Sequence, residues 1–499
     1  MSVASDENAS GDGLRWLRIW ASFGLAVLLL GGFAGLLRSE AVVVPDTRSY
    51  EIFQFSPVAA MAFEIRTPGY PMVLTISRGI SRITAETWSW QSVAVGIAVL
   101  FHAIACTALL WELVAWRVRW LVVAGATVAV AFGCTNWNLS TTLTPDAIAM
   151  STMVLAAVAV MRWWRSGRKR DAIWVGAMSI AAIAMKPAYL FLLPWSVLIA
   201  LVVPGIVSGP GRRLIHAATM NLIPIVVLLG WVTFRYSASG DVGLLPFGHQ
   251  NMAAVTTQLL SATELQSLPG GNGELGRRIA NLRRDRHGVA SDNGDMETIR
   301  DPGLAMRYDD SPIDEPITSF TTLETRWDKT IYEVVIPASR AMGGNVNRQH
   351  QRIGDLNRAI VRGYPMRYGR YVLLAIRRGL WGTAANIVMH PPFLLALVIA
   401  AVVCSWRVCR GAASCHSQTT LQLDITDRRR FIDGITALGF VGVSLMLSNI
   451  AFVSLSSPPI GRFADAGAAL VPAWLVACGL NRWLRRVDKT WQATTTSPP

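Results

Sequence analysis

Long apolar runs separated by short polar connections dominate the chain. Apolar runs of about 17 to 25 residues can cross a bilayer as helices. The pattern predicts spans at residues 16–37, 88–113, 119–138, 143–164, 171–186, 188–207, 214–234, 384–406, 431–453 and 466–484. Lys186-Pro187 ends the short fifth run, so the fifth and sixth runs are either a broken pair or two full spans. We therefore expect an all-α polytopic membrane protein with about ten transmembrane helices.

Two connections are far longer than the others, one near the N-terminus and one in the second half of the chain. In the second, apolar residues recur at helical spacing, which predicts helices rather than strands. We expect helices within 252–268, 276–286 and 347–362, a mobile loop at 287–318, and an interfacial amphipathic helix at 365–383. The predicted regions are an N-terminal module (1–235) with the loop 38–87, a large outward loop (236–383), C-terminal helices (384–489) and a disordered tail (490–499).

The distribution of charged residues predicts how the helices are oriented in the membrane. The chain contains 46 Lys or Arg and 32 Asp or Glu, and arginines cluster in every second connection. Cytoplasmic loops carry such an excess, so we expect both termini and the 407–430 connection in the cytoplasm, with the two long loops outside. Hydrophobic residues make up 52% of the chain and charged residues 16%, which excludes a cytosolic globular enzyme. The predicted partners include membrane lipids of the cytoplasmic (inner) membrane but no nucleic acid.

The first outward loop carries the strongest candidate chemistry. Asp46-Thr-Arg-Ser-Tyr is followed by Arg66-Thr-Pro-Gly-Tyr-Pro, so a carboxylate and a guanidinium share one short loop. Asp46 could accept a proton, and Arg66 could pair bidentately with a phosphate. The alternative is an Asp46 side chain that caps a helix and an Arg66 side chain that reaches lipid headgroups. The residues alone leave both interpretations open.

Four further residues carry two interpretations each. Lys186 and Arg462 are placed near outer ends of spans, where a cation either binds a lipid phosphate or reaches the headgroups. Asp146, after Pro145, is either a helix N-cap or a second carboxylate facing Asp46. His249 is either a metal ligand or general acid/base, or an ordinary packing residue.

These motifs resemble the GT-C superfamily of integral-membrane glycosyltransferases, and most closely the bacterial relatives of protein O-mannosyltransferases and lipid A aminoarabinose transferase. The resemblance covers residues 14–235 and 430–480, beginning with a retained first helix. It implies transfer of a sugar from a polyprenyl-phosphate carrier to a glycan, lipid or protein acceptor on the outer face. Asp46 would be the catalytic Asp of the first loop, and Arg66 and Tyr70 would bind the substrate or its lipid phosphate. Agreeing features are Thr144-Pro145-Asp146, Lys186-Pro187 and Gly461-Arg462-Phe463.

The expected reaction is an inverting displacement at the anomeric carbon. Asp46 takes the proton of the acceptor hydroxyl, and Arg66, Lys186 and Arg462 stabilise the departing phosphate. The sugar arrives activated on its lipid, so no nucleotide cofactor is needed, and a divalent metal is left open without a recognisable ligand set. A transporter or flippase for lipid-linked sugars is the leading rival, although the two halves of the chain do not match as transporter repeats do. A non-catalytic membrane binding partner is the second.

Overall fold

The computed structural model describes residues 41–44, 46–85, 87–131, 141–203, 210–288, 316, 320–389 and 433–495, without the side chains of 286–288, 462 and 488–495. These residues are helical and contain no strand, and a single bridge joins Val42 to Thr142. The predicted all-α class is thus confirmed for the described chain. The predicted spans 16–37 and most of 384–406 lie outside the described residues.

Four of the described helices are long and apolar enough to cross a membrane. They are α4 (Trp90–Ala115), α7 (Asp146–Ser166), α10 (Pro210–Ser239) and α19 (Gly434–Ser454). Shorter or more polar helices occupy other predicted spans: α5 (Trp120–Ala131), α8 (Lys169–Met185), α9 (Leu192–Val202) and α21 (Val471–Thr495). The described helices therefore support a membrane-embedded protein, and the count of about ten spans stays a prediction.

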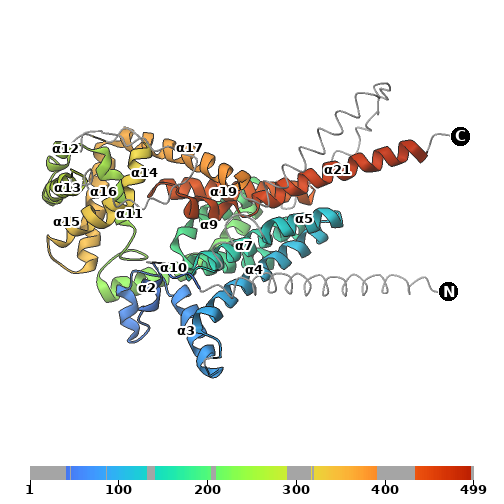
Figure 1. Cartoon of the computed structure of the whole chain (residues 1–499), viewed down its shortest axis with the longest axis horizontal. Helices are drawn as coiled ribbons and strands as arrows, with labels where there is room; N and C mark the ends of the chain where they lie inside the picture. Colours follow the sequence, from blue (N-terminus) through green and yellow to red (C-terminus); the bar gives the residue numbers. More distant parts are fainter. Residues whose placement is uncertain are drawn as a thin grey trace.

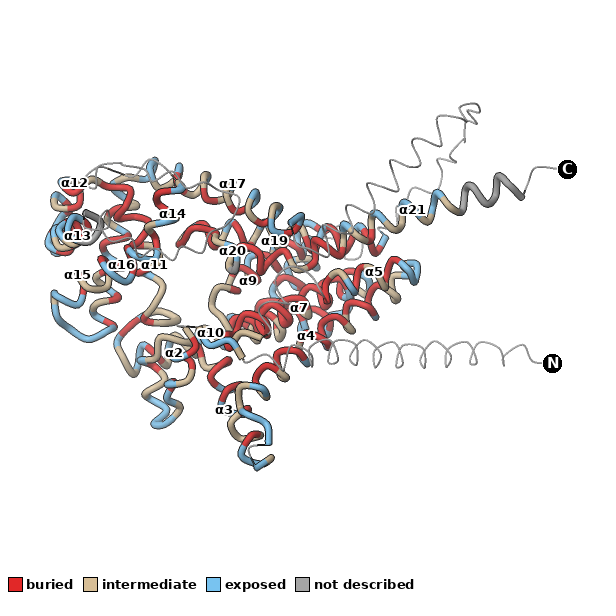
Figure 2. Tube along the Cα trace, in the orientation of Figure 1, coloured by how far each residue is buried: buried red, intermediate tan, exposed pale blue. Residues whose placement is uncertain are grey.

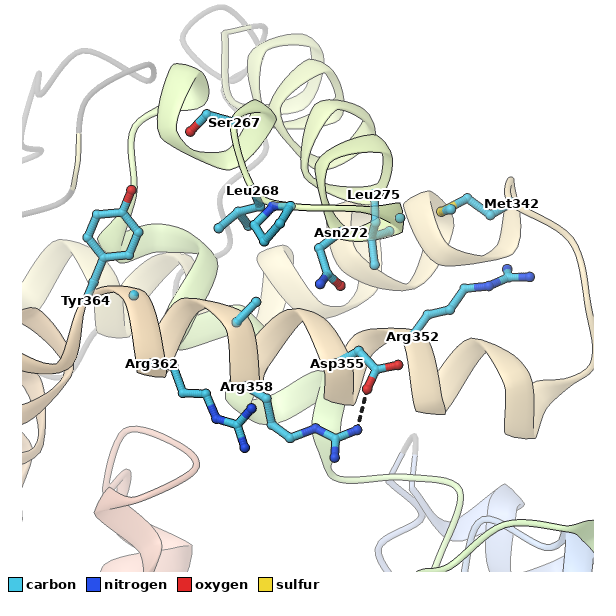
Figure 3. Close-up of a pocket in the computed structure, with 14 residues that line it drawn as sticks. Ser267, Leu268, Asn272, Leu275, Met342, Arg352, Asp355, Arg358, Arg362 and Tyr364 are labelled. Carbon is cyan, nitrogen blue, oxygen red and sulfur yellow. Dashed lines mark hydrogen bonds and ion pairs between the residues drawn. The ribbon is translucent and has the colours of Figure 1, made fainter.

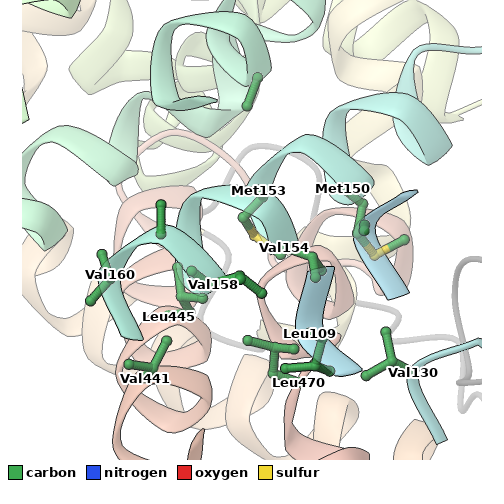
Figure 4. Packing of buried hydrophobic residues seen from close by; sticks show 14 of the residues in the cluster. Leu109, Val130, Met150, Met153, Val154, Val158, Val160, Val441, Leu445 and Leu470 are labelled. Carbon is green, nitrogen blue, oxygen red and sulfur yellow. The ribbon is translucent and has the colours of Figure 1, made fainter. Parts of the chain in front are cut away.

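Helix α7 forms the centre of the bundle. Small residues, above all alanines, allow α4, α8 and α19 to approach it closely. Figure 4 shows Met153 and Val158 of α7 packed with Leu109 of α4 and Leu445 of α19. By contrast, α10 exposes Leu222, Val226, Leu229 and other apolar side chains. An apolar face without protein cover is typical of contact with lipid.

The chain breaks at Lys186, as the sequence predicts. Helix α8 ends at Met185, Lys186 is extended with φ −151°, and Pro187 begins a short 3₁₀ turn, η2 (Pro187–Phe191), that leads into α9. Proline disfavours the helical conformation in the residue before it, which explains the break. The Lys186 side chain is therefore placed at the end of a helix.

The residues between α10 and α17 form a separate helical region, which we call the outer domain. Figure 1 shows it at the left, at the opposite end of the molecule from the C-terminal helix α21. Its elements are α11 (His249–Thr256), η3 (Thr257–Leu259), α12 (Ala262–Gln266), α13 (Gly271–Gly288), α14 (Phe320–Lys329), η4 (Thr330–Val335), α15 (Ile336–Arg340) and α16 (Val346–Gly363). One small apolar core lies among these elements, and a second is shared with Tyr371 and Ala375 of α17. Figure 2 shows buried segments in this region. The prediction of helices is confirmed, while most of the expected mobile loop 287–318 lies outside the described residues.

The segment 252–268 does not form one continuous helix. Ser261 caps α12 in a capping box, since its hydroxyl accepts from the backbone N–H of Glu264 at 3.2 Å and the Glu264 side chain accepts from the backbone N–H of Ser261 at 2.8 Å. This cap starts a new helix and separates α12 from α11.

Helix α17 (Pro365–Met389) is amphipathic, as predicted, but continues past residue 383. Its buried stripe of Tyr371, Ala375 and Gly379 extends through Thr383 and Ile387, so nothing in the packing ends the helix there. A Cβ at Gly379 would meet Ile450 of α19 at 2.7 Å, which explains the small residue. Similarly, α21 continues to Thr495, although the sequence predicts a disordered tail from residue 490.

Candidate functional site

Asp46 and Arg66 form an ion pair on the predicted loop 38–87. Nη2 of Arg66 donates to Oδ1 of Asp46 at 2.8 Å, and Nε of Arg66 donates to the Ser49 hydroxyl at 2.8 Å. Asp46 occupies the N-cap position of α2 (Thr47–Glu51), but its side chain makes no capping hydrogen bond. Of the two interpretations, the capping role is therefore wrong for the Asp46 side chain. The carboxylate binds Arg66.

Arg66 is held on several sides and keeps donors for a ligand. Its guanidinium carbon lies 4.6 Å from the ring centroid of Tyr50 and 5.7 Å from that of Phe247. Nη1 makes no hydrogen bond with any residue that the structure describes. The side chains of Arg66 and Asp46 are 19% and 28% exposed, so a ligand can reach both. A guanidinium fixed in this way presents N–H groups that suit a phosphate oxygen.

The segment before α2 is docked on the entry to α7. The Val42 amide donates to the Thr141 carbonyl, and the Leu143 amide donates to the Val42 carbonyl, both at 3.0 Å. The buried Thr47 hydroxyl donates to the Leu143 carbonyl at 3.0 Å. These bonds join two segments that are almost a hundred residues apart. They place Asp46 beside the beginning of α7.

The Arg66-Thr-Pro-Gly-Tyr-Pro motif rests on the last turn of α8. Thr67 donates a hydrogen bond to the Met185 carbonyl at 3.4 Å, and α3 (Gly69–Ile83) begins directly afterwards. A Cβ at Gly69 would lie 2.5 Å from the Ala184 carbonyl oxygen, so only glycine permits this approach. The motif therefore brings Arg66 toward the end of α8 and hence toward Lys186.

Tyr70 lies buried between the two halves of the site. Its ring packs edge-to-face on Tyr50, with centroids 5.2 Å apart and planes at 87°. Burial raises the pKa of the Tyr70 hydroxyl, and the nearby Tyr50 and Asp146 add to this effect. The hydroxyl is consequently protonated at physiological pH and can donate a hydrogen bond.

Asp146 and Lys186 form a second, more deeply buried ion pair. Helix α7 begins at Asp146 with Pro145 in the N-cap position, so the N-cap interpretation of Asp146 is wrong. Its carboxylate instead binds the Lys186 ammonium, and the two side chains are 7% and 15% exposed. A carboxylate in the first turn also interacts favourably with the helix dipole of α7.

Aromatic residues complete the site through contacts that the sequence did not predict. The Lys186 ammonium lies 4.9 Å from the ring centroid of Phe463, in α20 (Gly461–Ala464). Trp327 of α14 packs against Phe463 at a centroid distance of 6.5 Å. Phe247 and Phe463 therefore contact the two cations from distant parts of the chain. The side chain of the neighbouring Arg462 lies outside the described residues.

His249 packs against a second histidine of the outer domain. The rings of His249 and His350 stack with centroids 4.1 Å apart and planes at 18°. Burial lowers the pKa of both, that of His350 to about 4. Across the described ranges, no three His, Cys, Asp or Glu side chains are grouped so as to hold a metal ion. His249 therefore packs on His350, and its role as a metal ligand or general acid/base stays a prediction.

The two ion pairs lie at one end of α7, while Glu112 and Arg165, paired at 2.9 Å, lie at the other. A helix of 21 residues is about 30 Å long, which equals the thickness of the hydrocarbon core. Fold and site therefore define a helical membrane protein with a polar site at one end of its bundle. No family model, curated protein or solved structure matches the chain.

Proposed function

We propose that the chain is a polyprenyl-phosphate-dependent membrane glycosyltransferase that works on the outer face of the cytoplasmic membrane. The observation that carries this proposal is the Asp46–Arg66 pair, in which a proton acceptor and a phosphate-binding cation are held together on one partly exposed loop. The two motifs that carry the resemblance to GT-C enzymes begin with these two residues. The second cation, Lys186, belongs to the same end of the bundle.

In the proposed reaction, the acceptor hydroxyl attacks the anomeric carbon as Asp46 takes its proton. The bond between that carbon and the phosphate oxygen breaks, and the polyprenyl phosphate leaves with the electron pair. Nη1 of Arg66 and the Lys186 ammonium stabilise the negative charge that develops on the phosphate. Attack from the side opposite the leaving group inverts the sugar configuration.

The position of the charged pairs favours an enzyme over a transporter. Transporters bind their substrates near the bilayer midplane. In the described bundle, Asp146 and Lys186 lie at helix ends, and Nε2 of His102, within α4, donates to the Ala131 carbonyl at 3.0 Å. A midplane site is thus not what these contacts suggest. A non-catalytic binding protein would not need Asp46 at all.

The test is turnover by the purified protein in lipid nanodiscs. We would offer a panel of polyprenyl-phosphate sugars with soluble and lipid acceptors, and measure both the glycosylated product and the free polyprenyl phosphate. Equal amounts of the two products are expected. If a fluorescent lipid-linked sugar instead crosses the bilayer of a proteoliposome uncleaved, the transporter interpretation is correct.

The proposed orientation has a separate test. Single cysteines replacing Ser267 in the outer domain and Arg168 between α7 and α8 would be introduced into a cysteine-free variant. A membrane-impermeant reagent added to intact cells should label position 267 and spare position 168, because arginine-rich connections stay in the cytoplasm. The opposite pattern would place Asp46 in the wrong compartment for this mechanism.

A further inference from the structure

The outer domain contains an open groove whose occupant the proposed reaction does not explain. It lies between the segment 267–275 and helix α16, and has a volume of about 950 Å³ (Figure 3). Leu268, Leu275 and Met342 give it apolar lining, while Asn272 and Tyr364 contribute polar and aromatic groups. Such a mixture of apolar walls and placed polar groups is typical of a ligand site.

Arginines dominate the charge of this groove. Arg352, Arg358 and Arg362 line it from one helix, and Asp355 is the acidic residue among the lining side chains. From Arg352 to Arg362, the helix rises about 15 Å. The three cations are therefore spread along one helix at the groove, with Arg352 pointing above α16 and Arg358 and Arg362 below it in Figure 3.

The three arginines are not all neutralised by the protein. Arg358 binds Asp355, and both side chains are more than half exposed. Arg352 donates to the Gly343 carbonyl at 2.6 Å, a bond that leaves its charge unpaired. Arg362 makes no hydrogen bond or ion pair with the residues that the structure describes. One acid against three cations leaves the groove positive.

The excess of positive charge is local to the groove. Residues 236–379 as a whole contain 18 Lys or Arg and 16 Asp or Glu, so their net charge is only +2. A local cluster of one sign still concentrates ligands of the opposite sign.

We propose that this groove binds an acidic saccharide, namely an acceptor glycan that carries carboxylates or phosphates. The acceptor role rests on the proposed glycosyltransferase function. The groove wall formed by the start of α13 lies at the far end of the molecule from α21 (Figure 1). This position favours a soluble chain over a bilayer surface. An arginine side chain pairs with a carboxylate or a phosphate equally well, so the shared chemistry is the anion.

The test measures binding rather than turnover. Full-length protein in phosphatidylcholine nanodiscs would be titrated with fluorescent tetragalacturonate and with fluorescent maltotetraose, a neutral chain of the same length. We expect saturable binding of the acidic chain that weakens as salt is raised, and at least tenfold weaker binding of the neutral chain. Competition by inorganic phosphate that exceeds competition by free galacturonate would assign phosphate as the preferred group, and the reverse would assign carboxylate.

Variants test whether the acidic saccharide binds in this groove. Combining Arg352→Gln, Arg358→Gln and Arg362→Gln should weaken tetragalacturonate binding at least tenfold. A control that combines Arg326→Gln, Arg370→Gln and Arg377→Gln removes the same charge from α14 and α17, and should bind as the parent does. Equal loss in both variants, retained binding in the first, or no binding to the parent in neutral nanodiscs would overturn the proposal. Asp46→Asn should bind normally, so failure of the transferase mechanism and failure of the groove can be told apart.

Discussion

Arg235 and Arg66, both on the outer-domain side of the bundle, differ in how many of their guanidinium nitrogens have a hydrogen-bond partner in the protein. Arg235, at the end of α10, is fully buried. Its Nε donates to the Ala62 carbonyl at 3.0 Å, Nη1 to the Gly243 carbonyl at 2.6 Å, and Nη2 to Asp241 at 3.1 Å. Every nitrogen of this guanidinium has a protein partner. The group joins the bundle, the loop that contains Ala62 and the outer domain.

Arg66 makes fewer bonds and remains accessible. Nε and Nη2 are bound by Ser49 and Asp46, whereas Nη1 has no hydrogen-bond partner in the described part of the chain. The side chain is 19% exposed. A buried cation that is fully bound stabilises the fold, while a fixed cation with donors left over can bind a ligand. The difference separates a structural charge from a functional one within a single protein.

The largest expected effect is on stability, at Arg235. Arg235→Met removes the partner of the buried Asp241 carboxylate and two carbonyl bonds, and should lower the free energy of unfolding by about 3–5 kcal/mol. Arg278→Met, in an exposed pair with Glu274, is the matched control and should cost less than about 0.5 kcal/mol. Unfolding in mixed detergent and SDS measures both. Similar losses of unfolding free energy in the two variants would contradict a structural role for Arg235.

At the site, the expected effect is on carrier binding. Arg66→Ala and Lys186→Ala should each weaken binding of the polyprenyl-phosphate sugar by about 1.5–3 kcal/mol, the usual range for hydrogen bonds to charged groups. Arg78→Ala, on α3 against Trp90, is the control and should bind like the parent. Binding is measured with folded protein only. Full affinity in both site variants would leave these cations without a phosphate-binding role.

A smaller effect on stability is expected where the motif contacts α8. Gly69→Ala places a Cβ 2.5 Å from the Ala184 carbonyl oxygen, so α3 must shift, at a cost of about 1–3 kcal/mol. Gly79→Ala lies on the same helix with nothing within 4 Å of its Cβ, and should be neutral or slightly stabilising. The same unfolding assay compares them. Equal stability would show that the close approach is not needed.

The smallest effect is a pH dependence of the outer domain. The pKa of His350 is lowered to about 4 by burial and by His249, below its ordinary value of 6.5. Between these values the unfolded chain binds more protons than the folded one, so stability is complete above pH 6.5 and is lost as the pH falls toward 4. Its facing groups are His249, Asp241 and Arg235.

We expect a loss on the order of 1 kcal/mol at pH 5, and a flatter profile for His350→Gln. Unfolding measured from pH 7.5 to pH 4.5 provides the comparison. An unchanged slope in the variant would mean that His350 does not titrate in this range.

Hydropathy and local signals predicted much of the fold. The apolar runs gave α4, α7, α10 and α19, and Lys186-Pro187 gave the break after α8. The Ser261-x-x-Glu264 signature was present for the division between α11 and α12, but the apolar spacing across 252–268 obscured it. The end of α17 was not predictable from polarity, because its small-residue stripe continues into the apolar segment.

The sequence predicted which residues belong to the site. It did not predict which of them form ion pairs with each other. Asp46 and Arg66 stand out because loop residues of these types suit phosphate chemistry. The ion pair of Asp146 with Lys186 depends on how α7 packs on α8, which a local sequence pattern does not indicate. Phe247 and Phe463 lie in connections without periodicity, so only the folded chain brings them to the cations.

The central claim is that Asp46 removes the acceptor proton, and Asp46→Asn tests it most directly. Asparagine keeps the shape of the side chain and can still accept a bond from Arg66, so fold and carrier binding should survive. Turnover of the purified variant should fall by about 10²- to 10⁴-fold, the usual contribution of a general base. Sugar transfer at the parental rate would contradict the mechanism.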